Sequence, residues 1–112
     1  MSSEMVIFTR TYELLQWILP KSERFPKLYR NTVTHRLMSA VLDLQEALIL
    51  AQTFTDKIRL RHLRDADAQL SKVRLYLRLI HQWRWLSQGQ YLHVSRIVDE
   101  IGRLLGGWLK QT

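Results

Sequence analysis

The chain contains no cysteine, so disulfide bonds and thiolate-bound metals play no part in its fold or chemistry. Only two prolines and four glycines interrupt its 112 residues, and there is no glycine-rich phosphate-binding loop. No apolar run approaches the roughly 20 residues that a membrane-spanning helix needs. The first residues, MSSEMVIFTRTYELL, lack the basic start and the cleavage site of a signal peptide. We therefore expect one domain, residues 1–112, in the cytoplasm and without a membrane partner.

Acidic residues are few relative to basic ones. The sequence holds 10 Asp and Glu against 17 Lys and Arg, which gives a formal net charge of +7 at pH 7, and 12 of the basic residues are arginine. Such an excess on a small domain favours an anionic partner, with nucleic acid the first candidate. The alternative is a solvated surface that happens to be basic.

The residue patterns of catalytic sites are also missing. Asp65 and Asp67 are two positions apart on a predicted helix and point in different directions, so they do not form an acid–base couple. The histidines, at positions 35, 62, 81 and 93, show neither HExxH nor Glu-x-x-His spacing. No serine lies in a nucleophile elbow, and no carboxylate cluster suits the metal of a nuclease. We predict a binding protein rather than an enzyme, with no cofactor and no metal.

Apolar residues recur at three- and four-residue steps over most of the chain, which is the pattern of amphipathic helices. The predicted helical stretches are residues 3–19, 26–52, 56–86 and 87 onward. Pro20 is expected to end the first helix, and Pro26 suits the first turn of the second. Ser87 with Gln90 fits a capping box for the last helix. The sequence predicts an all-α fold, an up-down-up-down antiparallel four-helix bundle.

The third helix carries two apolar rows. The row predicted to face the core consists of Leu63, Ala66, Leu70, Val73, Leu77 and Ile80. A second row, Leu75, Leu79 and Trp83, lies on nearly the opposite side. Because a helix at the edge of a monomeric bundle has no use for two apolar sides, we predict that Leu75, Leu79 and Trp83 form an oligomer interface.

Basic residues accompany these rows. Arg74, Arg78 and His81 form a narrow strip between them, and two arginines one turn apart repel each other unless an anion binds. Cations near the start of a helix oppose its dipole by about 0.3–1 kcal/mol each, so stability alone does not select them there. The candidate nucleic-acid or polymerase contacts are Lys57, Arg59, Arg61, Arg64, Arg74 and Arg78. The alternative is that these side chains are solvated and make scattered ion pairs worth about 0–1 kcal/mol each.

Two further expectations concern the first and last helices. The core-facing row of the first helix is predicted to be Met5, Phe8, Tyr12, Leu15 and Leu19, widened by Ile7, Leu14 and Ile18. In the last helix Gly102 and Gly106 lie one turn apart, at a cost of about 1 kcal/mol each relative to alanine. That cost is understandable if another backbone approaches closely at these positions.

Three segments carry a resemblance to a known family. LRDADAQLSKVRLYLRLI in the third helix and IGRLLGGWLK in the fourth resemble the Avd accessory proteins of diversity-generating retroelements. The junction LPKSERFPKLYRNTV is similar both to these proteins and to the related four-helix proteins encoded in intervening sequences of bacterial 23S rRNA genes. The resemblance spans nearly the whole chain, and the two helix segments together favour Avd.

The resemblance implies a basic four-helix bundle that assembles as a homopentameric barrel. It also implies an accessory role without catalysis, in which the protein binds the element's reverse transcriptase and its template RNA or cDNA during error-prone cDNA synthesis. The residues on which this inference from the family rests are Asp65, Ala66, Asp67, Arg74, Arg78, Gly102, Gly106 and Trp108. Because the sequence stops soon after the last helix, we do not expect nucleic-acid contacts through a basic tail. The alternative is a stand-alone oligomeric interaction protein of the intervening-sequence type, without a polymerase partner.

Overall fold

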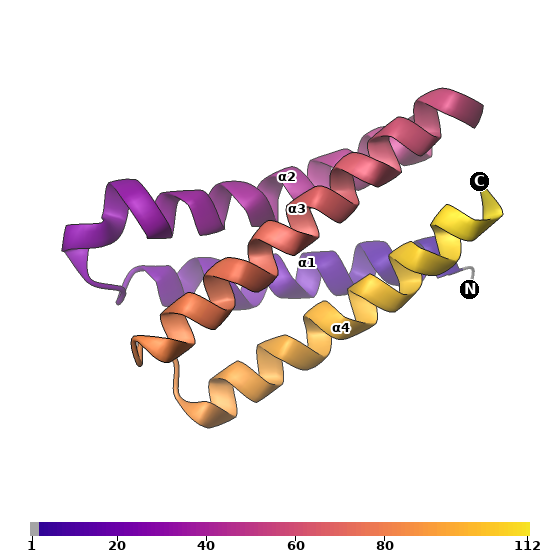
Figure 1. Ribbon diagram of the computed structural model, residues 1–112. Coiled ribbons are helices and arrows are strands. Elements are labelled where there is room, and N and C mark those ends of the chain that lie inside the picture. The colour runs from indigo at the N-terminus through magenta and orange to yellow at the C-terminus, as the bar shows by residue number, and fades with distance from the viewer. Residues whose placement is uncertain (1–2) are drawn as a thin grey trace.

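The computed structural model describes residues 3–112, with side chains from residue 6 onward, and this part of the chain is almost entirely helical. Its elements are α1 (Ser3–Ser22), η1 (Lys27–Tyr29), η2 (Arg30–Thr34), α2 (His35–Thr53), α3 (Asp56–Gln82) and α4 (Gln88–Gln111). Consecutive helices run antiparallel and α4 packs back against α1, so that the start of α1 and the end of α4 lie at the same end of the bundle as the connection from α2 to α3 (Figure 1). The predicted all-α, up-down-up-down four-helix bundle is confirmed. No helix among the described residues has the length and apolar character needed to cross a membrane.

The boundaries of the first two helices differ from the prediction. Pro20 does not end α1, which continues to Ser22, because a proline removes only its own N–H and the next residues still bond to the preceding turn. Pro26 precedes η1, and the segment up to Thr34 forms 3₁₀ and π turns in place of the expected α-helix. The β-branched run at residues 32–34 has low α-helical propensity, which is consistent with this departure.

The third helix ends at Gln82, earlier than the predicted Leu86, because the backbone turns left-handed at Arg84 with a φ of 64°. The capping box of the fourth helix is confirmed by a hydrogen bond in each direction. The backbone N–H of Gln90 donates to the Ser87 hydroxyl at 3.1 Å, and the N–H of Ser87 donates to the Gln90 side chain at 2.9 Å.

The core row predicted for α3 is confirmed at every position, since each member is at most 3% exposed. The core row predicted for α1 is wrong at Tyr12 and Leu19, which are exposed, and Phe8 and Leu15 are half-buried. The residues predicted to widen it, Ile7, Leu14 and Ile18, are buried as expected, and Met5 lies outside the described side chains. Thr11 completes the buried row, and its hydroxyl donates to the carbonyl of Ile7 at 2.9 Å. Because Thr11 is polar, it interrupts the apolar pattern of the buried side, and the sequence therefore favoured the row through Tyr12.

Candidate nucleic-acid interface

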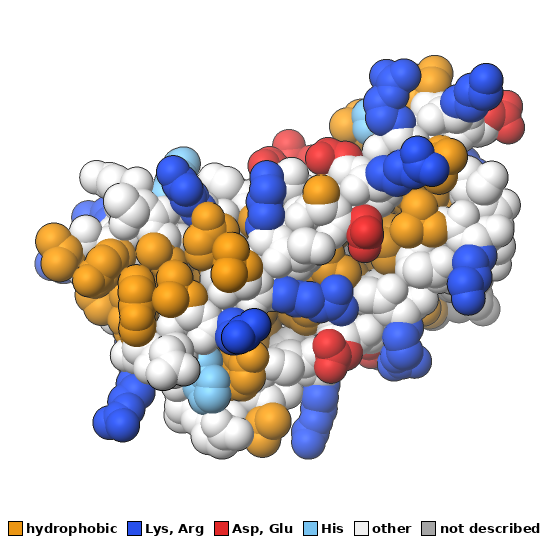
Figure 2. All heavy atoms as spheres, in the orientation of Figure 1, with side chains coloured by type: hydrophobic (Ala, Val, Ile, Leu, Met, Phe, Trp, Pro, Cys, Tyr) orange, Lys and Arg blue, Asp and Glu red, His pale blue; other side chains and the backbone are white. Residues whose placement is uncertain are grey.

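A basic groove lies along the junction of α3 and α4. Arg74 and Arg78 of α3 line a shallow pocket of about 340 Å³ together with Tyr91, Ser95 and Asp99 of α4. Lys and Arg side chains gather over this junction in the middle of Figure 2, with a histidine close to them. We call this feature the α3–α4 groove. The two arginines that the sequence placed one turn apart therefore line the same pocket.

The Arg74 side chain extends across the groove to Asp99 and Gly102 of α4. Its Nη2 lies 4.0 Å from the Oδ1 of Asp99, at the outer limit of an ion pair, and both side chains are well exposed. Its guanidinium also lies over Gly102, where an added Cβ would collide with the same Nη2 atom. A backbone was expected to approach Gly102, and this expectation is wrong because the neighbour is the Arg74 side chain. A Cβ at Gly106 would meet no atom of another described element within 4 Å.

The groove continues into an aromatic pair. The rings of His81 on α3 and Tyr91 on α4 stack in parallel, with centroids 3.9 Å apart and an interplanar angle of 5°. The Nε2 of His81 is 2.9 Å from the Oε1 of Gln88, which fixes the orientation of the imidazole. The sequence placed His81 in the basic strip but gave no sign of Tyr91 or Ser95, because only helix packing decides which face of α4 lies against α3.

Three of the other candidate cations occupy the outward face of α3. Lys57, Arg61 and Arg64 are exposed, and their three- and four-residue spacing places them in line with Leu75 and Arg78. Among the described residues, no carboxylate lies within ion-pairing distance of Lys57, Arg61, Arg64 or Arg78. A cationic helix face without carboxylate partners is a surface that an anionic ligand can neutralise.

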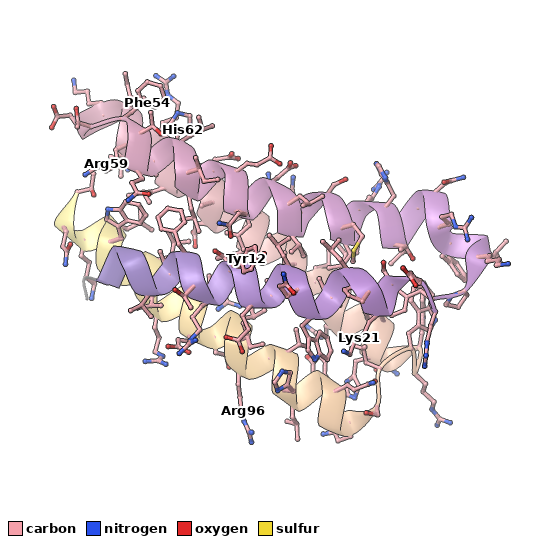
Figure 3. All side chains as sticks on the ribbon, turned by 180° about the vertical axis from the view of Figure 1, so that it is seen from behind. Tyr12, Lys21, Phe54, Arg59, His62 and Arg96 are labelled. Carbon is pink, nitrogen blue, oxygen red and sulfur yellow. The ribbon has the colours of Figure 1, made fainter. Side chains whose placement is uncertain are left out.

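Arg59 differs from its neighbours because it is engaged within the molecule. Its Nε donates to the carbonyl of Ala51 at 2.8 Å and to that of Phe54 at 3.0 Å, which satisfies carbonyl groups at the end of α2. Its guanidinium also lies 5.9 Å from the ring centre of Trp108 on α4. Figure 3 shows Arg59 between the start of α3 and the C-terminal end of α4, whereas Arg96 points away from the bundle.

The second apolar row of α3 lies outside the core of the subunit. Leu75 is 59% exposed, Trp83 is 41% exposed and Leu79 is half-buried. Trp83 joins an aromatic cluster with Tyr29 and Trp85, at centroid distances of 5.1 and 5.5 Å. Hydrophobic side chains gather at the left of Figure 2, over the segment before α2 and the C-terminal part of α3. Contact of this row with another subunit stays a prediction.

The titratable groups of the described chain do not assemble into a metal site: no group of three or more His, Asp or Glu side chains is close enough to hold an ion. Among the ion pairs of the described side chains, the shortest joins α1 to α4. The Nε of Arg10 lies 2.8 Å from the Oε2 of Glu100, and this hydrogen bond raises the pKa of the Arg10 guanidinium.

Comparison with known proteins agrees with the resemblance that the segments LRDADAQLSKVRLYLRLI and IGRLLGGWLK predicted. Among solved structures, the chain is similar to a protein of unknown function from the S23 ribosomal protein family of Bacteroides thetaiotaomicron, with a TM-score of 0.88. The two share 14% sequence identity over 97% of this chain and 99% of that chain, so this likeness shows the fold alone. No curated protein sequence matches. The model of the bAvd-like family matches residues 5–112, and the chain belongs to that family.

Proposed function

We propose that this protein is a non-catalytic accessory protein of a diversity-generating retroelement, and that it binds the element's reverse transcriptase and its template RNA or cDNA. Membership of the bAvd-like family supports the accessory role. The observation that carries the binding role is a set of α3 cations that have no carboxylate partner among the described side chains: Lys57, Arg61, Arg64 and Arg78, with Arg74 beside them. One guanidinium group can donate two parallel hydrogen bonds to the oxygens of a phosphate, and the release of counterions makes each such contact favourable at low salt.

The same proposal includes assembly into a homopentamer through Leu75, Leu79 and Trp83. An exposed apolar row on a helix that already faces a core is typical of a subunit interface. Five copies of a chain of net charge +7 carry +35, a field strong enough to draw an RNA strand from solution. The cations in line with Leu75 would then be repeated around the ring, next to each interface.

The test of nucleic-acid and polymerase binding is charge reversal in the groove. The double variant Arg74→Glu/Arg78→Glu is expected to abolish binding of template RNA and of the purified reverse transcriptase, because it replaces two cations with two anions at the same site. Fluorescence anisotropy with labelled RNA and co-purification with the polymerase measure the two losses. Since both side chains are exposed, the circular dichroism spectrum should be unchanged.

The matched control is Arg96→Glu/Arg103→Glu, which makes the same change of charge at exposed positions of α4. This control is expected to lower the affinity for RNA only by reducing the net positive charge of the molecule. Equal losses in the two double variants would mean that charge, and not the α3–α4 groove, determines binding. Wild-type affinity in Arg74→Glu/Arg78→Glu would refute the proposed role of these arginines.

A second candidate function is that of a stand-alone oligomeric interaction protein without a polymerase partner. The junction LPKSERFPKLYRNTV favours it, because this segment is similar to the four-helix proteins encoded in intervening sequences of 23S rRNA genes. A reverse transcriptase gene beside the gene of this protein, together with a variable repeat, supports the first candidate. The absence of both supports the second.

A further inference from the structure

We infer that the α3–α4 groove is a subsite for one nucleotide of a single strand: Arg74, Arg78 and the Ser95 hydroxyl hold its phosphate, and the stacked pair of His81 and Tyr91 receives its base. This inference rests on the proposed function, because it specifies the form of nucleic acid that the same groove takes. Each kind of contact uses side chains of both helices, and the packing of α3 on α4 places the two ends of the subsite next to each other.

The phosphate end of the subsite is defined by the groups that line the pocket. Arg74 and Arg78 supply two guanidinium forks, and Ser95 supplies a hydroxyl donor on the opposite wall. The carboxylate of Asp99 lies 4.0 Å from Arg74 and is 74% exposed, so it is the group with which a bound phosphate would compete for this guanidinium. An exposed ion pair of that length is weak, so a phosphate can displace it.

The base end is defined by the aromatic pair. His81 is one turn beyond Arg78 on α3, and Tyr91 lines the same pocket as the two arginines. The two rings are parallel and partly exposed, which gives a π surface next to the phosphate position. Bases of a single strand stack on such surfaces with little regard to sequence.

A duplex does not suit this arrangement. Its bases are already stacked on one another, so an aromatic pair beside the phosphates would gain nothing from them. An acidic peptide would use the arginines but would leave the rings of His81 and Tyr91 without a role.

The test compares a labelled RNA 12-mer without self-complementarity with the same strand annealed to its complement. In Tyr91→Leu the affinity for the single strand is expected to fall roughly 5- to 150-fold, the range that the stacking of one base supports. The affinity for the duplex should stay the same. Tyr91→Phe, which keeps the ring, should restore single-strand binding.

Two variants test the phosphate end and do not depend on the stability of Tyr91→Leu. Gly102→Ala places a methyl group where the Arg74 guanidinium lies, and it is expected to weaken single-strand binding, whereas the matched Gly106→Ala should not. Asp99→Asn removes the competing carboxylate and is expected to strengthen single-strand binding. The control Asp43→Asn makes the same change of charge at an exposed position of α2 and is expected to have a smaller effect.

Equal losses for single strand and duplex in Tyr91→Leu, or no loss for either, would overturn the subsite. So would equal behaviour of Gly102→Ala and Gly106→Ala, or binding of polyglutamate in place of RNA at the groove. None of these results bears on the proposed function by itself. That function fails if the wild-type protein binds neither template RNA nor the purified reverse transcriptase.

Discussion

Arg84 is the residue at which the chain leaves α3, and its backbone has a left-handed φ of 64°. The N–H of Trp85 donates to the carbonyl of Ile80 at 2.9 Å, and the N–H of Arg84 donates to that of His81 at 3.0 Å. These two bonds form a Schellman motif, in which glycine commonly occupies the left-handed position. An arginine there is strained because its Cβ crowds the backbone.

Replacing this arginine is therefore expected to stabilise the fold. Arg84→Gly should raise the free energy of unfolding by about 0.5–1 kcal/mol, because the relief of strain exceeds the additional chain entropy of glycine in the unfolded state. Urea denaturation followed by circular dichroism measures the change. Arg84→Ala, which keeps the strain and removes the guanidinium, should give no gain. A lower midpoint for Arg84→Gly than for the wild type would contradict this account of the turn.

At the scale of the elements, the α2–α3 hairpin depends on an arginine that the sequence grouped with phosphate ligands. The N-cap position of α3, Thr55, makes no side-chain capping bond, and Asp56 has a φ of 54°. Arg59 instead bonds to the carbonyls of Ala51 and Phe54, so it connects the first turn of α3 to the last turn of α2. Figure 3 shows Phe54, Arg59 and His62 at this end of the molecule.

Arg59 and Arg61, two positions apart and on nearly opposite sides of α3, should therefore behave in opposite ways. Arg59→Gln is expected to lower the free energy of unfolding by about 2 kcal/mol, since it removes charged hydrogen bonds to helix-end carbonyls, while changing RNA affinity little. Arg61→Gln, at an exposed position, should change stability by no more than about 0.5 kcal/mol and should weaken RNA binding. Thermal denaturation and anisotropy titration of both variants give the comparison. A weaker RNA complex for Arg59→Gln at unchanged stability would assign Arg59 to the nucleic acid instead.

At the scale of the whole molecule, the second apolar row of α3 bears on how many copies assemble. Leu75 and Tyr12 are equally exposed, at 59%, but they lie on different helices, and Tyr12 is seen on α1 from behind in Figure 3. Leu75 belongs to the row that leads to Trp83 and the aromatic cluster, whereas Tyr12 lies on α1 and its hydroxyl accepts a hydrogen bond from Gln16. The pair thus offers a matched comparison.

Light scattering of the purified protein tests the assembly. The wild type is expected near 67 kDa, five times the chain mass of 13.4 kDa, and Leu75→Glu is expected at the mass of a monomer because a buried charge opposes association. Tyr12→Glu should keep the wild-type mass. A wild-type particle of 13.4 kDa at micromolar concentration would refute the predicted interface of Leu75, Leu79 and Trp83.

The sequence by itself determined the helical class, the order of the helices and the core side of α3, because apolar periodicity is a local property of the chain. It placed Arg74 and Arg78 in one strip for the same reason. Only the tertiary structure decided that Thr11 belongs to the core row of α1, since a buried hydroxyl is acceptable once it bonds to a nearby carbonyl. Packing alone also brought Tyr91 and Gly102 beside the α3 strip and turned Arg59 toward α2, because contacts between helices depend on crossing geometry that no single helix encodes.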